Sequence, residues 1–290
     1  MAQLSILIVN YNNGHFFEDA YRSLLRQTSD QWEAVVIDDA STDNSVEVIQ
    51  KLISGDNPFH FYQNEKTLGI QYAVMRAIAI SSRGIFGRLD PDDALYPEAV
   101  EFSLRAHQNH PEVGLVYSDL TVCDQNLILQ SEHRSVQIDQ LDVKSLIFNR
   151  EINSFATFKK KLNRGTSGID PTLKRSEDVD VYMKMIEVAP VLHLPNPLYY
   201  YRIHNKNASK MDNEERSYFW HWVALLKTAD RRNIDLENIF VEHVVDLSEL
   251  IVYKKCVSYI KSLLRKKRVF SAIVGAAARF GINKHSILKS

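Results

Sequence analysis

A regular alternation of short apolar runs with segments of helical spacing constrains the fold of this chain more than any other feature. The apolar runs are short enough for buried strands, and polar or turn-forming residues end each of them. Strands that alternate with helices form a parallel sheet with helices on both faces, so we expect an α/β fold. The expected strands cover residues 4–9, 32–37, 59–63 and 85–89, and the expected helices cover residues 16–27, 41–53 and 70–80.

The rest of the chain is patterned less regularly. Residues 126–175 are more polar and predict loops that form a variable wall of a site. From residue 211 onward helical periodicity replaces the alternation. We therefore predict one α/β domain over residues 1–210 and a helical C-terminal extension over residues 211–290. Within the second half of the α/β domain we expect helices at 97–109 and 179–188 and strands at 113–122 and 191–202.

The composition limits the classes of function. The 290 residues are 45% hydrophobic and 24% charged, which suits a globular protein with a sizeable core. The formal net charge is −1, so we expect no nucleic-acid partner. Cys123 and Cys256 lie far apart and predict no disulfide framework, which fits a reducing cytoplasm. The sequence shows no signal-peptide pattern and no spanning apolar run, so a cytoplasmic location is expected.

Polar clusters follow three of the expected strands, at the point where each strand ends. They are residues 10–12, 38–39 and 90–93. The carboxyl ends of parallel strands lie along one edge of a sheet, and ligands bind at that edge in open α/β folds. We therefore expect these three clusters to form one site.

The last cluster places Asp90, Asp92 and Asp93 within four residues. Like charges this close repel, so a bound cation gives a physical reason to hold them together. Carboxylate oxygens are hard ligands that suit Mg²⁺ or Mn²⁺. The alternative is a solvated turn that caps the helix beginning near Pro97.

Five segments of the chain, taken together and in their order along the sequence, resemble the family 2 glycosyltransferases, which have the GT-A fold. The resemblance extends over about residues 3–210. It implies a Rossmann-like, mostly parallel sheet flanked by helices, and inverting transfer of a sugar from a nucleotide-sugar to an acceptor hydroxyl. The segments that carry it are residues 5–12, 35–43, 88–93, 176–178 and 201–204.

The resemblance implies a donor site. Tyr11 would stack on the nucleobase, usually uracil, and Asp39 would contact the same base. Asp90 would face the ribose or the sugar, and Val9 and Gly69 would line the donor site. Ordinary strand-end packing for Tyr11 and a helix-capping role for Asp39 remain open alternatives.

The resemblance also implies a metal site with Asp92 or Asp93 as the carboxylate ligand, a choice that the sequence does not settle. His204 would complete it, although a lone histidine near a strand end is often structural. An imidazole ligand favours Mn²⁺ over Mg²⁺. Arg202 would either reach the diphosphate or pair with an acid.

The Glu-Asp pair at Glu177 and Asp178 corresponds to the pair that carries the catalytic base in this family. We predict Asp178 as the base and Glu177 as a residue that orients it or binds the acceptor. Asp180 is a rival for the base, and capping of the following helix is an alternative role for the pair. Met75 departs from the Asn that many relatives carry, and residues 167–170 depart from a Gly-Gly-aromatic-Asp turn.

The C-terminal region suggests partners. Basic and apolar residues over 254–278 suit either a helix on the inner face of an anionic membrane or a solvated basic helix face. The apolar residues near Trp222 suit a core or a homodimer contact. We expect a nucleotide-sugar donor and a glycan or lipid-linked acceptor, in the synthesis of a surface polysaccharide or lipid-linked oligosaccharide. The alternatives are a non-catalytic nucleotide-sugar-binding module and a nucleotidyltransferase, although residues 4–14 lack the glycine-rich loop of the latter.

Overall fold

The computed structural model describes residues 3–139, 152, 155–204, 214–235 and 237. The predicted membrane contact of residues 254–278 lies outside these residues. No helix in the described part of the chain has the length and apolarity that crossing a bilayer requires. Contacts between residues divide the chain into two compact units, Met1–Arg231 and Arg232–Ser290. The helices and strands described below belong to the first unit.

The first four predicted strands form a parallel half-sheet, as expected. β1 (Leu4–Asn10) lies between β2 (Trp32–Asp38) and β4 (Ile85–Arg88), and β3 (Phe59–Gln63) pairs with β2. Because these strands are parallel, the carboxyl ends of β1, β2 and β4 lie at the same edge of the sheet, at Asn10, Asp38 and Arg88.

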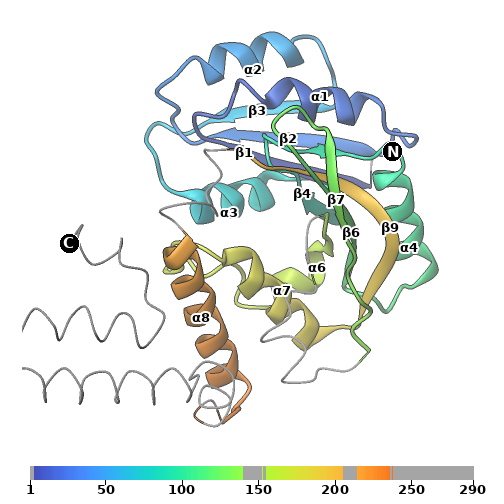
Figure 1. Cartoon of the computed structure of the whole chain (residues 1–290), viewed down its shortest axis with the longest axis vertical. Helices are drawn as coiled ribbons and strands as arrows, with labels where there is room; N and C mark the ends of the chain where they lie inside the picture. Colours follow the sequence, from blue (N-terminus) through green and yellow to red (C-terminus); the bar gives the residue numbers. More distant parts are fainter. Residues whose placement is uncertain (1–2, 140–151, 153–154, 205–213, 236, 238–290) are drawn as a thin grey trace, which may run out of the picture. The chain divides into compact units, whose positions relative to one another are not determined.

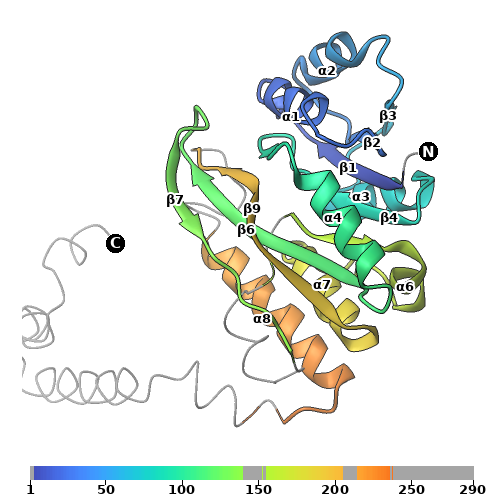
Figure 2. The same ribbon diagram turned by 90° about the vertical axis from the view of Figure 1, so that its right-hand side faces the viewer.

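The second half of the sheet is mixed. Its strands continue the sheet beyond β4 in the order β8-β6-β9-β5, and β7 pairs with β6. Only the β6–β9 pair is parallel in this half. Figure 2 shows β6, β7 and β9 as the long strands of this half. The five strands are β5 (Ala94–Leu95), β6 (Leu115–Cys123), β7 (Leu129–His133), β8 (Thr157–Lys159) and β9 (Val191–Arg202).

Residues 126–175 differ from the predicted run of loops. They contain β7 and β8, and the short helix α6 (Lys160–Gly165). β8 pairs with both β4 and β6 and so joins the two halves of the sheet. Its three residues are too few to give a strand period in the sequence, which explains why it was not predicted.

Alternate residues of β1 supply the two cores of the fold. Leu4, Ile6 and Ile8 pack with α1 and α2 on one face, and Leu7 and Val9 pack with α3 and α7 on the other. Figure 1 shows these helices on opposite sides of the strands. Burial on both faces is why β1 is a continuous apolar run. The helices are α1 (Phe17–Leu25), α2 (Ser45–Ile53), α3 (Ile70–Ile80), α4 (Ala99–Asn109) and α7 (Glu177–Val188).

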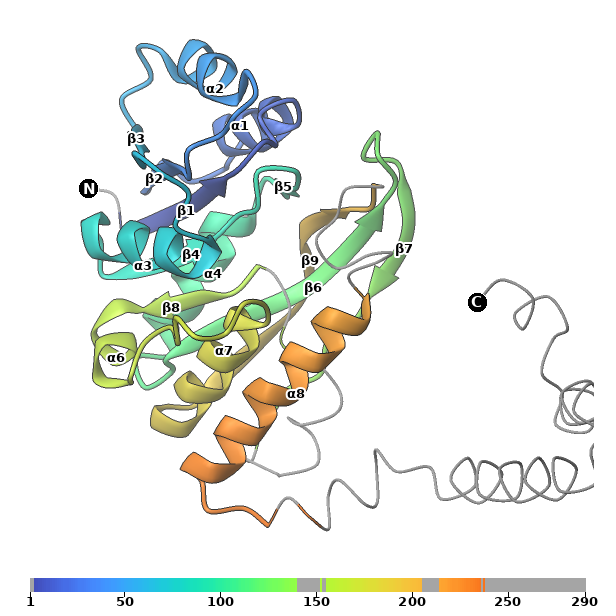
Figure 3. The same ribbon diagram turned by 90° about the vertical axis from the view of Figure 1, so that its left-hand side faces the viewer.

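The helix α8 (Glu214–Arg231) lies beside α7, as Figure 3 shows. Arg231 Nε donates to Glu187 Oε2 at 2.7 Å, and Thr228 packs against Met183. The predicted domain boundary after residue 210 and the predicted homodimer remain predictions.

A close contact between the loop after β1 and the start of α2 gives a stability prediction. A Cβ atom on Gly14 would lie 2.5 Å from Ser45 Cα, and the Gly14 N–H donates to Ser45 Oγ at 2.8 Å. Gly14→Ala should therefore lower the free energy of unfolding by about 1–3 kcal/mol, because the backbone must move. Thermal unfolding would measure the loss. Gly84→Ala is the control, since its Cβ would meet nothing within 4 Å; equal melting temperatures for the two variants would contradict the prediction.

Candidate functional site

A cavity of about 960 Å³ opens at the carboxyl ends of the parallel strands and extends to α7 and α8. Nine of the eleven residues predicted for the site line it, and they come from both halves of the sheet. Arg202 and His204 are the exceptions. The nine are Val9, Tyr11, Asp39, Gly69, Asp90, Asp92, Asp93, Glu177 and Asp178.

Tyr11 is an aromatic ring available to a ligand, since 48% of its surface is exposed beside the cavity. Asn12, the next residue, has a left-handed φ of 56°. Its amide oxygen accepts the backbone N–H of Thr42 at 2.8 Å, and its own N–H donates to Ser41 Oγ at 2.9 Å. These bonds fix the turn that presents Tyr11, and the exposed ring does not fit the packing alternative.

Asp39 organises the loop before α3. Its carboxylate accepts hydrogen bonds from Asn64 Nδ2 at 2.6 Å, from Leu68 N at 3.0 Å and from Gly69 N at 2.8 Å. Gly69 has a φ of 95°, a value that glycine adopts without strain. Asp39 does not cap a helix, because α2 begins at Ser45 with Asn44 as its N-cap residue. The neighbouring Asp38 accepts the Ser41 N–H at 2.9 Å in the loop before that helix. The contact of Asp39 with a base remains a prediction.

Asp90 is tied to the second half of the site by Arg88. Arg88 Nε and Nη2 donate to the two oxygens of Asp90 at 2.7 and 3.1 Å, and Nη1 donates to Glu177 Oε1 at 2.9 Å. Burial disfavours the charged guanidinium, but Asp90 and Glu177 outweigh it and raise the pKa of Arg88 well above its ordinary value. Arg88 lies within a segment that carries the family resemblance, yet the sequence assigned it no role.

Glu177 and Asp178 have different surroundings at the start of α7. Glu177 is buried, and burial raises the pKa of its carboxyl; Arg88 counteracts the rise and the charge on Asp178 adds to it. Asp178 is half-buried and lines the cavity. Among the described residues, its one hydrogen-bond partner is the N–H of Val179, at 2.9 Å. Ser176 has a left-handed φ of 58° and turns the chain into the helix at this point. Of the two acids, Asp178 is therefore the one whose carboxylate is more exposed on the cavity wall.

Asp180 does not share this position. It is buried, its Oδ2 accepts from Lys184 Nζ at 2.5 Å, and it does not line the cavity. This ion pair gives Asp180 a structural role and leaves Asp178 as the base candidate.

The two neighbouring candidates for a metal ligand, Asp92 and Asp93, have different surroundings. Asp92 Oδ2 lies 2.8 Å from His204 Nε2. Burial and the charge on Asp90 raise the pKa of Asp92, and His204 lowers it in part. Asp93 is 2% exposed, and its oxygens accept the Tyr199 hydroxyl and the Arg202 backbone N–H, both at 2.7 Å.

The residues near Asp92 suit a divalent cation in their chemistry. Within the described residues, no group of three or more His, Cys, Asp or Glu side chains is arranged as a ready metal site. The partly buried carboxylate of Asp92, beside a second carboxylate and an imidazole, nonetheless offers the O and N donors that Mn²⁺ accepts. A cation there would relieve the repulsion that raises the pKa of Asp92.

Arg202 is buried among protein acceptors. Its Nη2 donates to Asp19 Oδ2 at 2.6 Å, its Nη1 to the carbonyl of Gln125 at 2.6 Å and its Nε to the carbonyl of Asp92 at 2.5 Å. Pairing with an acid is therefore the alternative that these contacts support. The guanidinium holds the turn that carries Asp92, and its predicted contact with a diphosphate has no support here. Asp19 and Tyr199 are further members of this network that the sequence did not indicate.

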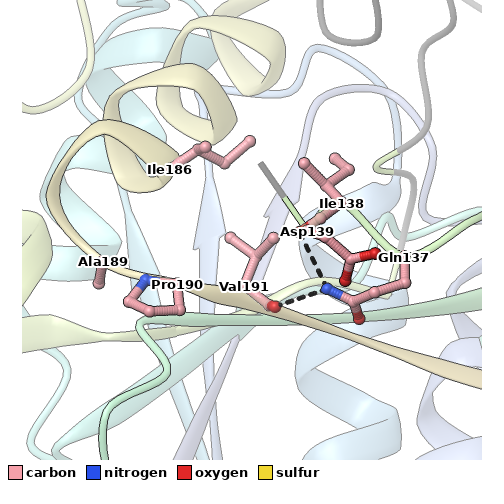
Figure 4. Close-up of a pocket in the computed structure, with 7 residues that line it drawn as sticks. All are labelled: Gln137, Ile138, Asp139, Ile186, Ala189, Pro190 and Val191. Atoms are coloured by element: carbon pink, nitrogen blue, oxygen red, sulfur yellow. Dashed lines mark hydrogen bonds between the residues drawn. The ribbon is translucent and has the colours of Figure 1, made fainter. Parts of the chain in front are cut away.

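A second, smaller cavity of about 300 Å³ lies between the end of α7 and the start of β9 (Figure 4). Gln137 Nε2 donates to the carbonyls of Ile138 and Val191 at its edge, both at 3.0 Å. Asp139 is the one ionisable residue among its lining residues. This cavity therefore lacks the clustered acids of the larger one.

Comparison with known proteins agrees with this geometry. The profile of the family described as "Glycosyl transferase family 2" matches residues 5–166, which is more than half of the chain. A chondroitin synthase of Pasteurella multocida is 25% identical over 259 residues, which cover 88% of this chain and 26% of the relative. A hyaluronan synthase of the same organism is 26% identical with the same coverage. The chain thus spans about a quarter of the length of these relatives.

Solved structures show the same fold. S. aureus TarS in complex with UDP-GlcNAc superposes with a TM-score of 0.63 at 16% identity, over 97% of this chain and 93% of that chain. A mannosyltransferase from Pyrobaculum calidifontis in complex with GDP-Man and Mn²⁺ superposes with a TM-score of 0.54 at 13% identity, over 97% and 88% of the two chains. The GT-A fold expected from the sequence is confirmed, and the profile match shows that this chain belongs to glycosyltransferase family 2.

Proposed function

We propose that the protein transfers a sugar from a UDP-sugar to an acceptor hydroxyl, with inversion at the anomeric carbon. The observation that carries this proposal is one cavity that holds both a donor-type cluster and an accessible carboxylate. Tyr11, Asp39 and Asp90 line its donor part, and Asp178 lines it at the start of α7.

The donor assignment rests on the chemistry of the cavity and on similar folds. The exposed ring of Tyr11 offers a face on which a base can stack, with Val9 and Gly69 beside it. UDP-GlcNAc is the ligand in the TarS complex, whose fold this chain shares. We infer a uridine nucleotide on these grounds.

Asp178 would act as the general base. As the acceptor oxygen attacks the anomeric carbon, its proton passes to Asp178, and the diphosphate leaves with the electron pair of the broken bond. A base must come within about 3 Å of the proton that it removes, and a carboxylate on a cavity wall can do so. Glu177 is held by Arg88 and does not need to touch the substrate.

Asp92 and His204 are the residues that would hold a divalent cation, Mn²⁺ or Mg²⁺. Such an ion supplies Lewis-acid stabilisation of the negative charge on the leaving diphosphate. Asp93 would support the site through Tyr199 and the backbone of Arg202 without being a ligand.

The acceptor proposed is a growing glycan or a lipid-linked glycan. Similar proteins include chondroitin and hyaluronan synthases, which supports a role in polysaccharide synthesis. A non-catalytic nucleotide-sugar-binding module would not need a carboxylate at Asp178 that is left accessible to an acceptor.

A thermal-shift screen of the purified chain against UDP-sugars, GDP-sugars and other nucleotides, each with and without Mn²⁺, tests the proposal. A ligand at 100 times its Kd adds about 2.7 kcal/mol, which raises the Tm by roughly 5–10 °C in a domain of this size. We expect the largest Mn²⁺-dependent shift with a UDP-sugar, followed by UDP release when an acceptor is added. A folded sample that responds to no nucleotide would overturn the proposal.

A further inference from the structure

Arg88 joins the two halves of the cavity through a single side chain. It ends β4 and contacts Asp90, two residues on, through two hydrogen bonds. It also contacts Glu177, at the start of α7 and 89 residues away in the chain. The Arg88 side chain is 29% exposed and lines the cavity, whereas that of Glu177 is 9% exposed.

The geometry of these contacts requires an arginine. A guanidinium is planar and offers donors on two edges, so it can bind one carboxylate with two donors and a second carboxylate with a third. A lysine ammonium at this position would keep the positive charge, but it could not bind both carboxylates in the same planar arrangement. Burial of Glu177 raises its pKa, and Arg88 is the positive charge that counteracts this. Without Arg88, the buried Glu177 would keep the repulsion from the half-buried Asp178 and lose the positive charge that counteracts it.

We propose that Arg88 is a positioning residue that holds the Glu177 side chain in place and so fixes the first turn of α7, which keeps Asp178 aimed at the acceptor. The inference rests on the proposed function. Because the same guanidinium also binds Asp90, one side chain links the donor part of the site to the turn that carries Asp178. Arg88 acts through Glu177 and need not touch the acceptor.

The opposite end of the same strand supplies a matched control. Arg83 precedes β4 and pairs with the buried Glu33 at 2.9 Å, with side-chain exposures of 35% and 5%. This pair resembles Arg88–Glu177 in distance and burial but lies at the other edge of the sheet, among Ser5 and Ser82. Loss of a buried ion pair as such should therefore have the same effect on stability at both ends of β4.

The test is a double-mutant cycle on the turnover of the UDP-sugar that gives the largest thermal shift, followed by UDP release. The variants are Arg88→Gln, Glu177→Gln, the double variant, Arg88→Lys and Arg83→Gln. We expect Arg88→Gln to lower kcat by about tenfold or more in the native background and by less than about threefold in the Glu177→Gln background, because the two residues act as a unit. Arg88→Lys should recover part of the loss.

Stability and binding complete the test. Both Arg88→Gln and Arg83→Gln should lower the Tm, but only the former should lower kcat in folded protein. UDP affinity, measured by calorimetry with Mn²⁺, should fall less than kcat in Arg88→Gln. Additive effects of Arg88→Gln and Glu177→Gln, or a kcat loss in Arg83→Gln as large as in Arg88→Gln, would overturn the inference. Absence of turnover by the native protein with every donor would instead count against the proposed transferase.

Discussion

Replacing Asp178 with asparagine is expected to lower the rate of sugar transfer by about 10²- to 10⁴-fold, the usual contribution of a positioned general base. Asparagine has nearly the same shape as aspartate and can still accept the Val179 N–H, so the start of α7 should keep its geometry. It cannot take up the acceptor proton. UDP release in the presence of acceptor measures the rate, and calorimetry with UDP and Mn²⁺ should give an affinity close to that of the native protein.

Asp180→Asn is the matched control for this variant, since it makes the same change two residues along the same helix. Asp180 is paired with Lys184 and lies outside the cavity. Its replacement should lower the Tm, because a buried ammonium loses its counter-charge, and leave kcat of the folded protein unchanged. If Asp178→Asn lost UDP binding together with turnover, Asp178 would be a donor-site residue instead of the base.

The parallel half of the sheet could be predicted because its signals are local. Each of β1 to β4 is a short apolar run that ends at polar residues, and the helices between them have their own period. The carboxyl ends of parallel strands share one edge of the sheet. This rule alone predicts that Tyr11, Asp39 and Asp90 lie near one another, without any knowledge of side-chain contacts.

In the second half, the predicted strands at 113–122 and 191–202 are confirmed as β6 and β9. The short strands β5 and β8 and the order of the strands could not be predicted, because distant partners set them. β5 has two residues and exists through its pairing with β9, where Ala94 lies opposite Tyr200. β8 is a strand because it bridges β4 and β6. No periodicity in segments of two or three residues can indicate a pairing with residues far along the chain.

The different contacts of neighbouring acids also could not be predicted from the sequence. Asp38 and Asp39 are chemically the same, yet Asp38 binds Ser41 and Asp39 binds the loop at Gly69. The direction of each side chain depends on the backbone where the strand ends, and there the regular alternation of a strand no longer applies. The pairing of Arg88 with Glu177 similarly exists only in the folded chain, since no pattern in either segment of the sequence indicates a contact with the other.

Asp92 and Asp93 are likewise neighbouring acids with different contacts, so their replacement should have different effects on metal binding. Asp92→Asn should remove the Mn²⁺-dependent part of the thermal shift with UDP, because an amide is a weaker ligand than a carboxylate and carries no charge. His204→Ala should weaken the same increment, since His204 Nε2 lies 2.8 Å from Asp92. The expected loss is most of the shift of several degrees that we expect for the native protein.

Asp93→Asn should behave differently, because Asp93 is engaged by the protein. Its carboxylate accepts the Tyr199 hydroxyl and the Arg202 N–H in a buried site, so its replacement should cost about 1–3 kcal/mol of stability. The Tm without ligand should therefore fall, while the further rise on addition of Mn²⁺ and UDP should remain. The opposite result, with the increment lost in Asp93→Asn and kept in Asp92→Asn, would make Asp93 the ligand. It would also mean that Asp93 exchanges Tyr199 for the ion when the donor binds.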